Sequence, residues 1–92
     1  MKRTTIKSLE RMAKEENANN TELGWRINWF DLLMYWLECG NTDMKAELDS
    51  MSKKDTLRVI DECVMHINNG AYDTSDLKSL YKIAMTSLEE RI

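Results

Sequence analysis

The sequence contains no proline and only three glycines among its 92 residues. Proline breaks helices and glycine supports the tight turns of hairpins, so their scarcity favours a helical chain over a β-rich one. Long apolar runs are absent too, since no stretch approaches the roughly 18 uncharged residues that a membrane span requires. The start, MKRTTIKSLERMAKEE, carries charges where a secretion signal has an apolar segment. We therefore expect a cytoplasmic protein that does not enter a membrane.

Motifs that carry chemistry are scarce as well. His66 is the only histidine, and we find no glycine-rich phosphate loop, paired-carboxylate motif or nucleophile elbow. Glu62, Cys63 and His66 are neighbours at helical spacing and could bind a metal together with Cys39. Structural zinc sites usually show paired ligands at both ends, so a buried, reduced thiol is the better interpretation of Cys63. We expect no enzymatic activity, no catalytic or metal-binding residues, and no cofactor.

The composition is that of one ordinary globular domain. Apolar residues make up 42% and charged residues 32%, a balance that argues against disorder. The net charge of −3 is unevenly distributed, because residues 1–14 hold five bases against one acid and residues 15–52 hold two bases against eight acids. The acidic middle disfavours nucleic-acid binding, which depends on Lys and Arg at phosphates. The basic start is typical of a solvated helix end.

Capping residues and apolar spacing predict an all-α fold, a compact bundle of four to five short helices around a central aromatic-rich helix. The expected helices cover about residues 4–16, 22–39, 42–51, 53–68 and 74–91. Gly40 and Gly70 are suited to the left-handed conformation that ends helices. Ser52 followed by Asp55 resembles a capping box at the start of the fourth helix.

The aromatic segment WRINWFDLLMYWLEC, residues 25–39, has more apolar surface than one face of a helix needs. On a helical wheel its apolar arc is about 220° wide, whereas a surface helix typically needs a stripe of little more than about 100°. One sector holds aliphatic residues and Phe30. The other holds Trp25, Trp29, Leu32 and Trp36. Two interpretations remain open: the whole helix is core, or the tryptophan sector meets a second chain.

Under the second interpretation, tryptophan and tyrosine supply large contact areas and the neighbouring acids discriminate between partners. The second chain is either another copy, giving a homodimer, or a different protein. The predicted partner-binding residues are Trp25, Trp29, Leu32, Trp36, Tyr35, Asp31 and Glu38.

Residues 55–91, DTLRVIDECVMHINNGAYDTSDLKSLYKIAMTSLEER, combine a TLxxVI-type helix, a turn with Tyr and Ser-Asp, and a helix with Leu, Tyr and Ala. In these features the segment resembles the Hha/YmoA nucleoid modulators, with an insertion near 65–69 and no counterpart of residues 1–50. The resemblance implies a partner among nucleoid-structuring proteins and assigns no site residue.

The short, acidic, helical profile also resembles that of accessory proteins of phages and mobile elements. That resemblance implies an inhibitor or regulator that occupies a host protein, such as a defence protein or a transcription factor. One alternative is a nucleic-acid-binding or nucleoid-associated regulator that uses Lys2, Arg3, Lys7 and Arg11. A second alternative is an oligomeric nucleotide or small-ligand sponge whose pocket is lined by Trp, Tyr and Arg26.

Overall fold

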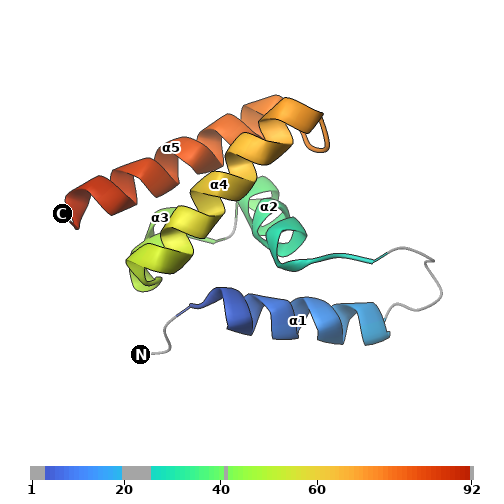
Figure 1. Cartoon of the computed structure of the whole chain (residues 1–92). Helices are drawn as coiled ribbons and strands as arrows, with labels where there is room; N and C mark the ends of the chain where they lie inside the picture. Colours follow the sequence, from blue (N-terminus) through green and yellow to red (C-terminus); the bar gives the residue numbers. More distant parts are fainter. Residues whose placement is uncertain (1–3, 20–25, 41, 92) are drawn as a thin grey trace.

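The computed structural model describes residues 4–19, 26–40 and 42–91. These residues form five helices and no strand, which confirms the predicted all-α bundle (Figure 1). The helices are α1 (Ile6–Asn19), α2 (Trp29–Cys39), α3 (Met44–Ser50), α4 (Lys53–Asn69) and α5 (Thr74–Glu90).

The helices pack around α2 and α5. The long helices α4 and α5 form a hairpin, and α3 packs against α5 near its carboxyl end. The aromatic helix α2 packs against α5 on one side and against α1 on the other (Figure 1). This arrangement makes α2 the central helix that the sequence predicts. No described helix is both long and apolar enough to cross a bilayer.

Local capping chemistry explains where most helices begin and end. All five described helices are preceded by a side chain that accepts a hydrogen bond from a backbone N–H of the first turn, which satisfies a donor that the helix leaves unpaired. These caps are Thr5, Asn28, Asp43, Ser52 and Asp73. Gly40 and Gly70 end α2 and α4 with φ of 69° and 70°. Both predicted glycine stops are therefore confirmed.

The start of α2 differs from the predicted helix over 22–39. The helix begins at Trp29, because Asn28 and Asp31 form a reciprocal capping box with hydrogen bonds of 2.8 and 2.9 Å. Arg26 and Ile27 are extended chain before the helix. Residues 22–25, including Trp25, lie outside the described part of the chain. Aromatic and apolar residues occur on both sides of Asn28. The spacing of apolar residues alone therefore did not indicate that the helix begins there.

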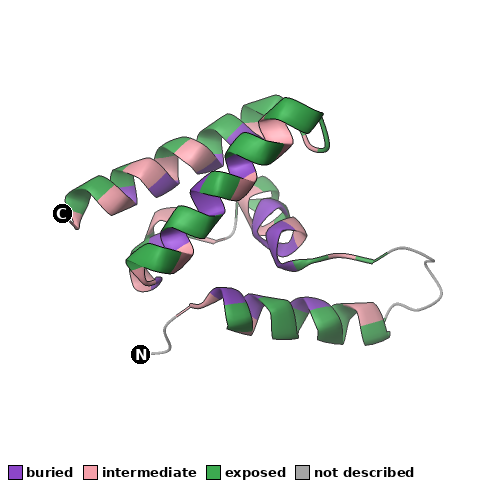
Figure 2. Cartoon of the chain, viewed as in Figure 1, coloured by how far each residue is buried: buried purple, intermediate pink, exposed green. Residues whose placement is uncertain are grey.

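The core is continuous through the bundle. Every helix contributes to it, and Phe30, Leu33, Leu48, Leu77 and Leu80 have no solvent exposure. Burial of each such side chain contributes about 1.5–3 kcal/mol. Figure 2 shows the buried positions of α2 and α4 turned toward the interior, while most of the surface of α1 is exposed.

Helix α1 contributes few core residues and is attached largely by hydrogen bonds. Its buried side chains are Ile6, Leu9 and Ala13. At its amino end, the backbone N–H of Ile6 donates to the Asp55 carboxylate of α4 at 3.1 Å, and Thr4 donates to the Glu47 carboxylate of α3. These bonds hold α1 across the bundle and fix its carboxyl end beside α2.

Candidate functional site

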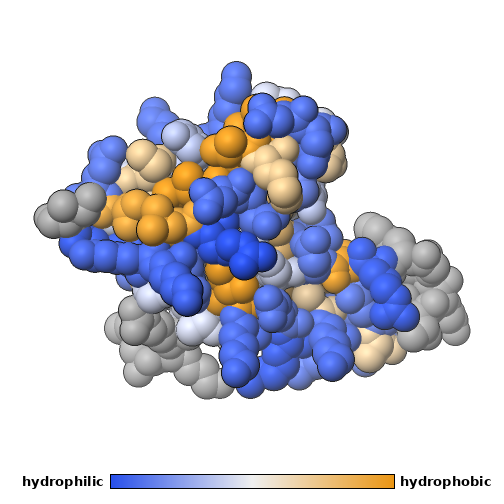
Figure 3. All heavy atoms as spheres, viewed as in Figure 1, coloured by the Kyte–Doolittle hydropathy of each residue, from blue (hydrophilic) through white to orange (hydrophobic). Residues whose placement is uncertain are grey.

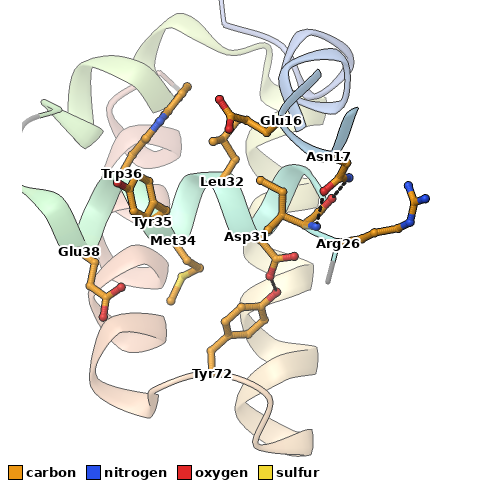
Figure 4. Close-up of a pocket in the computed structure, with 11 residues that line it drawn as sticks. Glu16, Asn17, Arg26, Asp31, Leu32, Met34, Tyr35, Trp36, Glu38 and Tyr72 are labelled. Atoms are coloured by element: carbon orange, nitrogen blue, oxygen red, sulfur yellow. Dashed lines mark hydrogen bonds between the residues drawn. The ribbon is translucent and has the colours of Figure 1, made fainter. Parts of the chain in front are cut away.

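A groove of about 640 Å³ opens on the outward side of α2. Its floor is α2, one wall is the carboxyl end of α1, and the other is the turn between α4 and α5 (Figure 4). The lining residues are Glu16, Asn17, Arg26, Ile27, Asp31, Leu32, Met34, Tyr35, Trp36, Glu38 and Tyr72. Five of the seven predicted partner-binding residues therefore line one concave surface.

Asn17 sets the distance between α1 and the chain that leads into α2. Its side-chain amide donates to the carbonyl oxygen of Ile27 and its amide oxygen accepts from the N–H of Ile27, both at 2.8 Å (Figure 4). This pair of bonds imitates the pairing of two backbone strands and joins residues that are ten positions apart in the sequence. The groove wall formed by α1 is therefore tied directly to the start of α2.

Tyr72 fixes the opposite wall. Its hydroxyl donates to the carboxylate of Asp31, and the two side chains point toward one another (Figure 4). Burial, followed by this bond to Asp31, raises the pKa of Tyr72 above its ordinary value. The ring also lies edge-on to Phe30 and His66, with centroids 5.4 and 4.7 Å away. Asp31 therefore serves both as a helix cap and as the anchor of the α4–α5 turn.

Tyr35 is the most exposed large aromatic side chain of the described residues. Its exposed fraction is 61%, although it lies at the centre of the outward face of α2. Its contact with the Cys39 side chain raises the pKa of Tyr35, and the nearby charge of Glu16 adds to the effect. Beside it, Trp36 is half-buried and packs against the core. The groove thus presents aromatic surface at its floor.

The structure places the predicted tryptophan sector differently from the partner-binding interpretation. Trp29 and Leu32 are each only 7% exposed and belong to the same core cluster as Leu9 of α1. The Arg58 guanidinium lies 5.7 Å from the ring centre of Trp29. Both side chains are therefore largely buried in the core, although Leu32 also lines the groove, and their partner-binding role stays a prediction. A helical wheel alone cannot show which neighbour packs on each sector of α2, and both α1 and α5 pack against this helix.

The outward face of α2 consists instead of polar and aromatic residues: Asp31, Tyr35 and Glu38 follow one another at spacings of four and three. All three were predicted as partner-binding residues, and that role stays a prediction. The sequence did not indicate Glu16, Asn17 or Tyr72. Glu16 and Asn17 lie at the end of the first predicted helix, which the sequence places at about residues 4–16, and Tyr72 lies in a turn far from α2 in sequence.

Charge in the groove is predominantly negative. In the part of the lining that the structure describes, Glu16, Asp31 and Glu38 supply three carboxylates and Arg26 supplies one guanidinium. Arg26 and Glu38 lie at opposite ends, and the Arg26 side chain extends away from the other labelled residues (Figure 4). A groove with apolar floor and acidic sides suits a ligand that combines positive charge with apolar groups.

The metal constellation considered from the sequence does not assemble. His66 Nε2 lies 3.2 Å from Glu62, but Cys63 is fully buried, and Cys39 is exposed at the end of α2. Both cysteines are free thiols. Within the described ranges, no group of three His, Cys, Asp or Glu side chains could hold a metal ion.

A second exposed apolar surface runs along α4. Leu57, Val64 and Met65 are 48%, 45% and 47% exposed. Figure 3 shows hydrophobic residues at the surface over α4 and α5, in contrast to the mostly hydrophilic surface of α1. A depression beside Leu57, lined by Lys54, Arg58 and other residues, is about half the size of the groove at about 330 Å³. This surface provides matched control positions for the groove.

Comparisons with protein-family models, curated proteins and solved structures find no match for the chain. The similarity of residues 55–91 to the Hha/YmoA modulators gains no support from a family match, and we carry it no further.

Proposed function

We propose that the chain is a small non-enzymatic protein-binding module that acts by occupying a partner protein through the α2 groove. The observation that carries this proposal is Tyr35, a largely exposed aromatic side chain inside a groove of about 640 Å³. Tyrosine and tryptophan are enriched among the residues that dominate binding energy, and such residues cluster in well-packed pockets of an interface.

The geometry of the groove favours a partner that needs little rearrangement of this chain. Asn17 and Tyr72 fix the two walls through hydrogen bonds to Ile27 and Asp31. A preformed site avoids the entropy cost of ordering its walls when a partner binds. The resemblance to phage and mobile-element accessory proteins supplies the proposed class of partner, a host protein such as a defence protein or transcription factor whose activity is blocked by occupancy.

A small-ligand site is the second candidate, because the groove volume lies within the range of about 300–1,000 Å³ typical of such sites. Tyr35, Trp36 and Arg26 are the residue types predicted for a nucleotide pocket. The three carboxylates count against an anionic nucleotide, which they would repel. Thermal denaturation with a panel of nucleotides and metabolites tests this candidate, since a ligand that binds the folded state raises the midpoint.

The nucleic-acid alternative has weaker support from the described residues. Lys2 and Arg3 lie outside them, and Lys7 and Arg11 are exposed on α1. The helix as a whole carries three bases and three acids, so it is electrically neutral. A neutral helix offers little of the phosphate neutralisation on which nucleic-acid affinity depends.

Parallel affinity captures from host lysate test the proposal, with the native chain, Tyr35→Ala and Leu57→Ala as bait. Leu57 is the matched control because it is also a large, exposed apolar residue, but lies outside the groove. We expect a set of proteins retained by the native chain and by Leu57→Ala and lost from Tyr35→Ala, since loss of a dominant contact weakens binding about 30-fold or more. Identical captures from all three baits, with circular dichroism showing equal folding, would refute the role of the groove.

A further inference from the structure

We infer that the occupant of the α2 groove is a short cationic segment of the partner protein, with an apolar or aromatic anchor flanked by lysine or arginine. This inference rests on the proposed protein-binding function and adds the chemistry of the partner. It follows from three properties of the groove: an apolar floor, acidic sides and limited length.

The sides set the charge of the segment. Among the described lining residues, three carboxylates stand against one guanidinium, so the negative groups exceed the positive by two; these residues are Glu16, Asp31, Glu38 and Arg26. Arg26 lies at one end and extends away from the others, which leaves the middle and the far end acidic (Figure 4). A cleft lined by charges of one sign concentrates ligands of the opposite sign. Lysine or arginine side chains on the segment complement this lining.

The floor sets the anchor. Leu32 and Met34, each 7% exposed, and the half-buried Trp36 line the groove together with the exposed ring of Tyr35. An aliphatic or aromatic side chain removes this surface from water, and a cation beside the anchor can lie over the face of Tyr35 or Trp36. The charges therefore determine which segment binds, and the floor supplies much of the affinity.

The length of the groove limits how much of the partner it holds. The outward face of α2 from Asp31 to Glu38 covers seven helical steps, or about 10 Å at 1.5 Å per residue. This length matches about two turns of a helix or three to four residues of extended chain. The segment is accordingly a short motif.

The cationic segment does not come from α1 of a second copy. Lys7, Arg11 and Lys14 lie on the exposed side of α1, but Glu10 and Glu15 lie close to them on the same helix. With Glu16 included, α1 carries equal numbers of positive and negative groups and is a poor complement for an acidic groove. A foreign segment with an excess of positive charge complements it better.

Two fluorescein-labelled peptides of equal length test the inference, one alternating pairs of lysine with pairs of leucine and the other replacing every lysine with glutamate. Fluorescence polarisation measures the affinity of each for the full chain. We expect the lysine peptide to bind at least tenfold more tightly than the glutamate peptide. Its affinity should fall when salt is raised, because salt screens exposed charges.

Charge reversals locate the effect. Glu38→Lys and Asp61→Lys change the net charge of the chain equally, but Asp61 lies on the outer side of α4, away from the α2 groove. We expect Glu38→Lys to lower the affinity for the lysine peptide about three- to tenfold. Asp61→Lys should lower that affinity less than twofold. Equal effects of the two reversals would show binding to overall charge and would overturn the inference.

Three further outcomes would also overturn it, and they separate its failure from that of the proposed function. If both peptides bind equally and both lose affinity in Tyr35→Ala, the groove is a docking site without preference for cations. If neither peptide binds while the lysate partners still depend on Tyr35, the function stands and the cationic segment is wrong. If light scattering shows that the native chain is a dimer and that Tyr35→Ala is a monomer, the occupant of the groove is a second copy of the chain.

Discussion

Cys63 and Cys39 are chemically distinct although both are free thiols. Cys63 is fully buried, and burial together with the charge of Glu62 raises its pKa to about 12, whereas Cys39 is exposed. Because the thiolate is the reactive form, we expect iodoacetamide at pH 8 to modify one cysteine of the folded chain and both in urea. Mass spectrometry reads the number of adducts. Rapid double modification without urea would contradict the burial of Cys63.

Among the arginines that the structure describes, Arg91 has the largest expected effect on stability. It donates to the carbonyl of Met51 and to the hydroxyls of Thr56 and Ser87, and both of these residues are fully buried. Arg91→Ala removes these bonds from buried groups, at an expected cost of about 1–3 kcal/mol. Arg58→Ala is the comparison, because Arg58 is largely exposed and its ion pair with Glu62 should contribute no more than about 1 kcal/mol. Urea denaturation gives the free energy of unfolding of the two variants. Equal decreases in Arg91→Ala and Arg58→Ala would contradict the larger structural role of Arg91.

Helix α3 has seven residues, too few to be stable alone, so its contacts with α5 hold it in place. The Asp49 carboxylate accepts from the Ser87 hydroxyl at 2.5 Å and from Lys45 at 3.0 Å. The Ser87 bond, followed by the Lys45 bond, lowers the pKa of Asp49 below its ordinary value of 3.8. A lowered pKa contributes stability that is present above the unfolded value and is lost as pH falls through the folded value.

We therefore expect the thermal midpoint to fall between about pH 5 and pH 2, and Asp49→Asn to make this decline shallower. The asparagine keeps an oxygen that can accept from Ser87 and removes the titrating group. Asp61→Asn on the exposed side of α4 is the matched control. If the thermal midpoint of Asp49→Asn falls with pH as steeply as that of the native chain, titration of Asp49 does not contribute to the loss of stability in acid.

The position of α1 relative to α2 depends on Asn17. Asn17→Ala removes both hydrogen bonds to Ile27 without touching Tyr35 or Trp36. We expect a loss of about 1–2 kcal/mol in stability and weaker binding of the lysine peptide, because the α1 wall is no longer fixed. Hydrogen exchange of α1 amides should quicken while that of α4 stays unchanged. If Asn17→Ala binds the lysine peptide as tightly as the native chain does, the hydrogen bonds of Asn17 are not needed for the groove to bind.

Several helix starts and ends that depend on one or two neighbouring residues were predicted correctly from the sequence. Gly40, Gly70 and Ser52 act through their own backbone or side chain, and each ends or begins a helix as expected. The start of α2 was wrong because the apolar pattern of residues 25–39 continues past its cap. Asn28 was predicted to lie inside the helix, but its side chain caps the first turn and the helix begins after it.

The candidate site depends on contacts between distant segments, which periodicity does not reveal. The wheel correctly separated Asp31, Tyr35 and Glu38 from the apolar arc, but it could not identify the neighbour that covers each sector. Since Trp29 and Leu32 are buried in the core cluster, the open face of α2 is the narrower, polar and aromatic one. The contact between Tyr72 and Asp31 spans forty-one positions and has no local signal.

The described part of the molecule offers two surfaces to a partner, the α2 groove and the exposed apolar residues of α4. The groove is acidic and fixed at both walls, whereas Leu57 and Val64 are exposed along α4, and Figure 3 shows hydrophobic residues at the surface over α4 and α5. Scattered apolar residues of the second kind are common on soluble proteins and carry no functional implication by themselves. The free chain should accordingly be a monomer whose groove is open to solvent.

The most direct test of this account is an NMR titration of the ¹⁵N-labelled chain with the lysine peptide. Binding in the groove predicts chemical-shift changes concentrated at the amides of Tyr35 and Glu38 on α2 and Tyr72 in the α4–α5 turn, with Leu57 and Val64 unaffected. Changes concentrated at Leu57 and Val64, or spread evenly over the acidic surface, would contradict the assignment of the groove as the docking site.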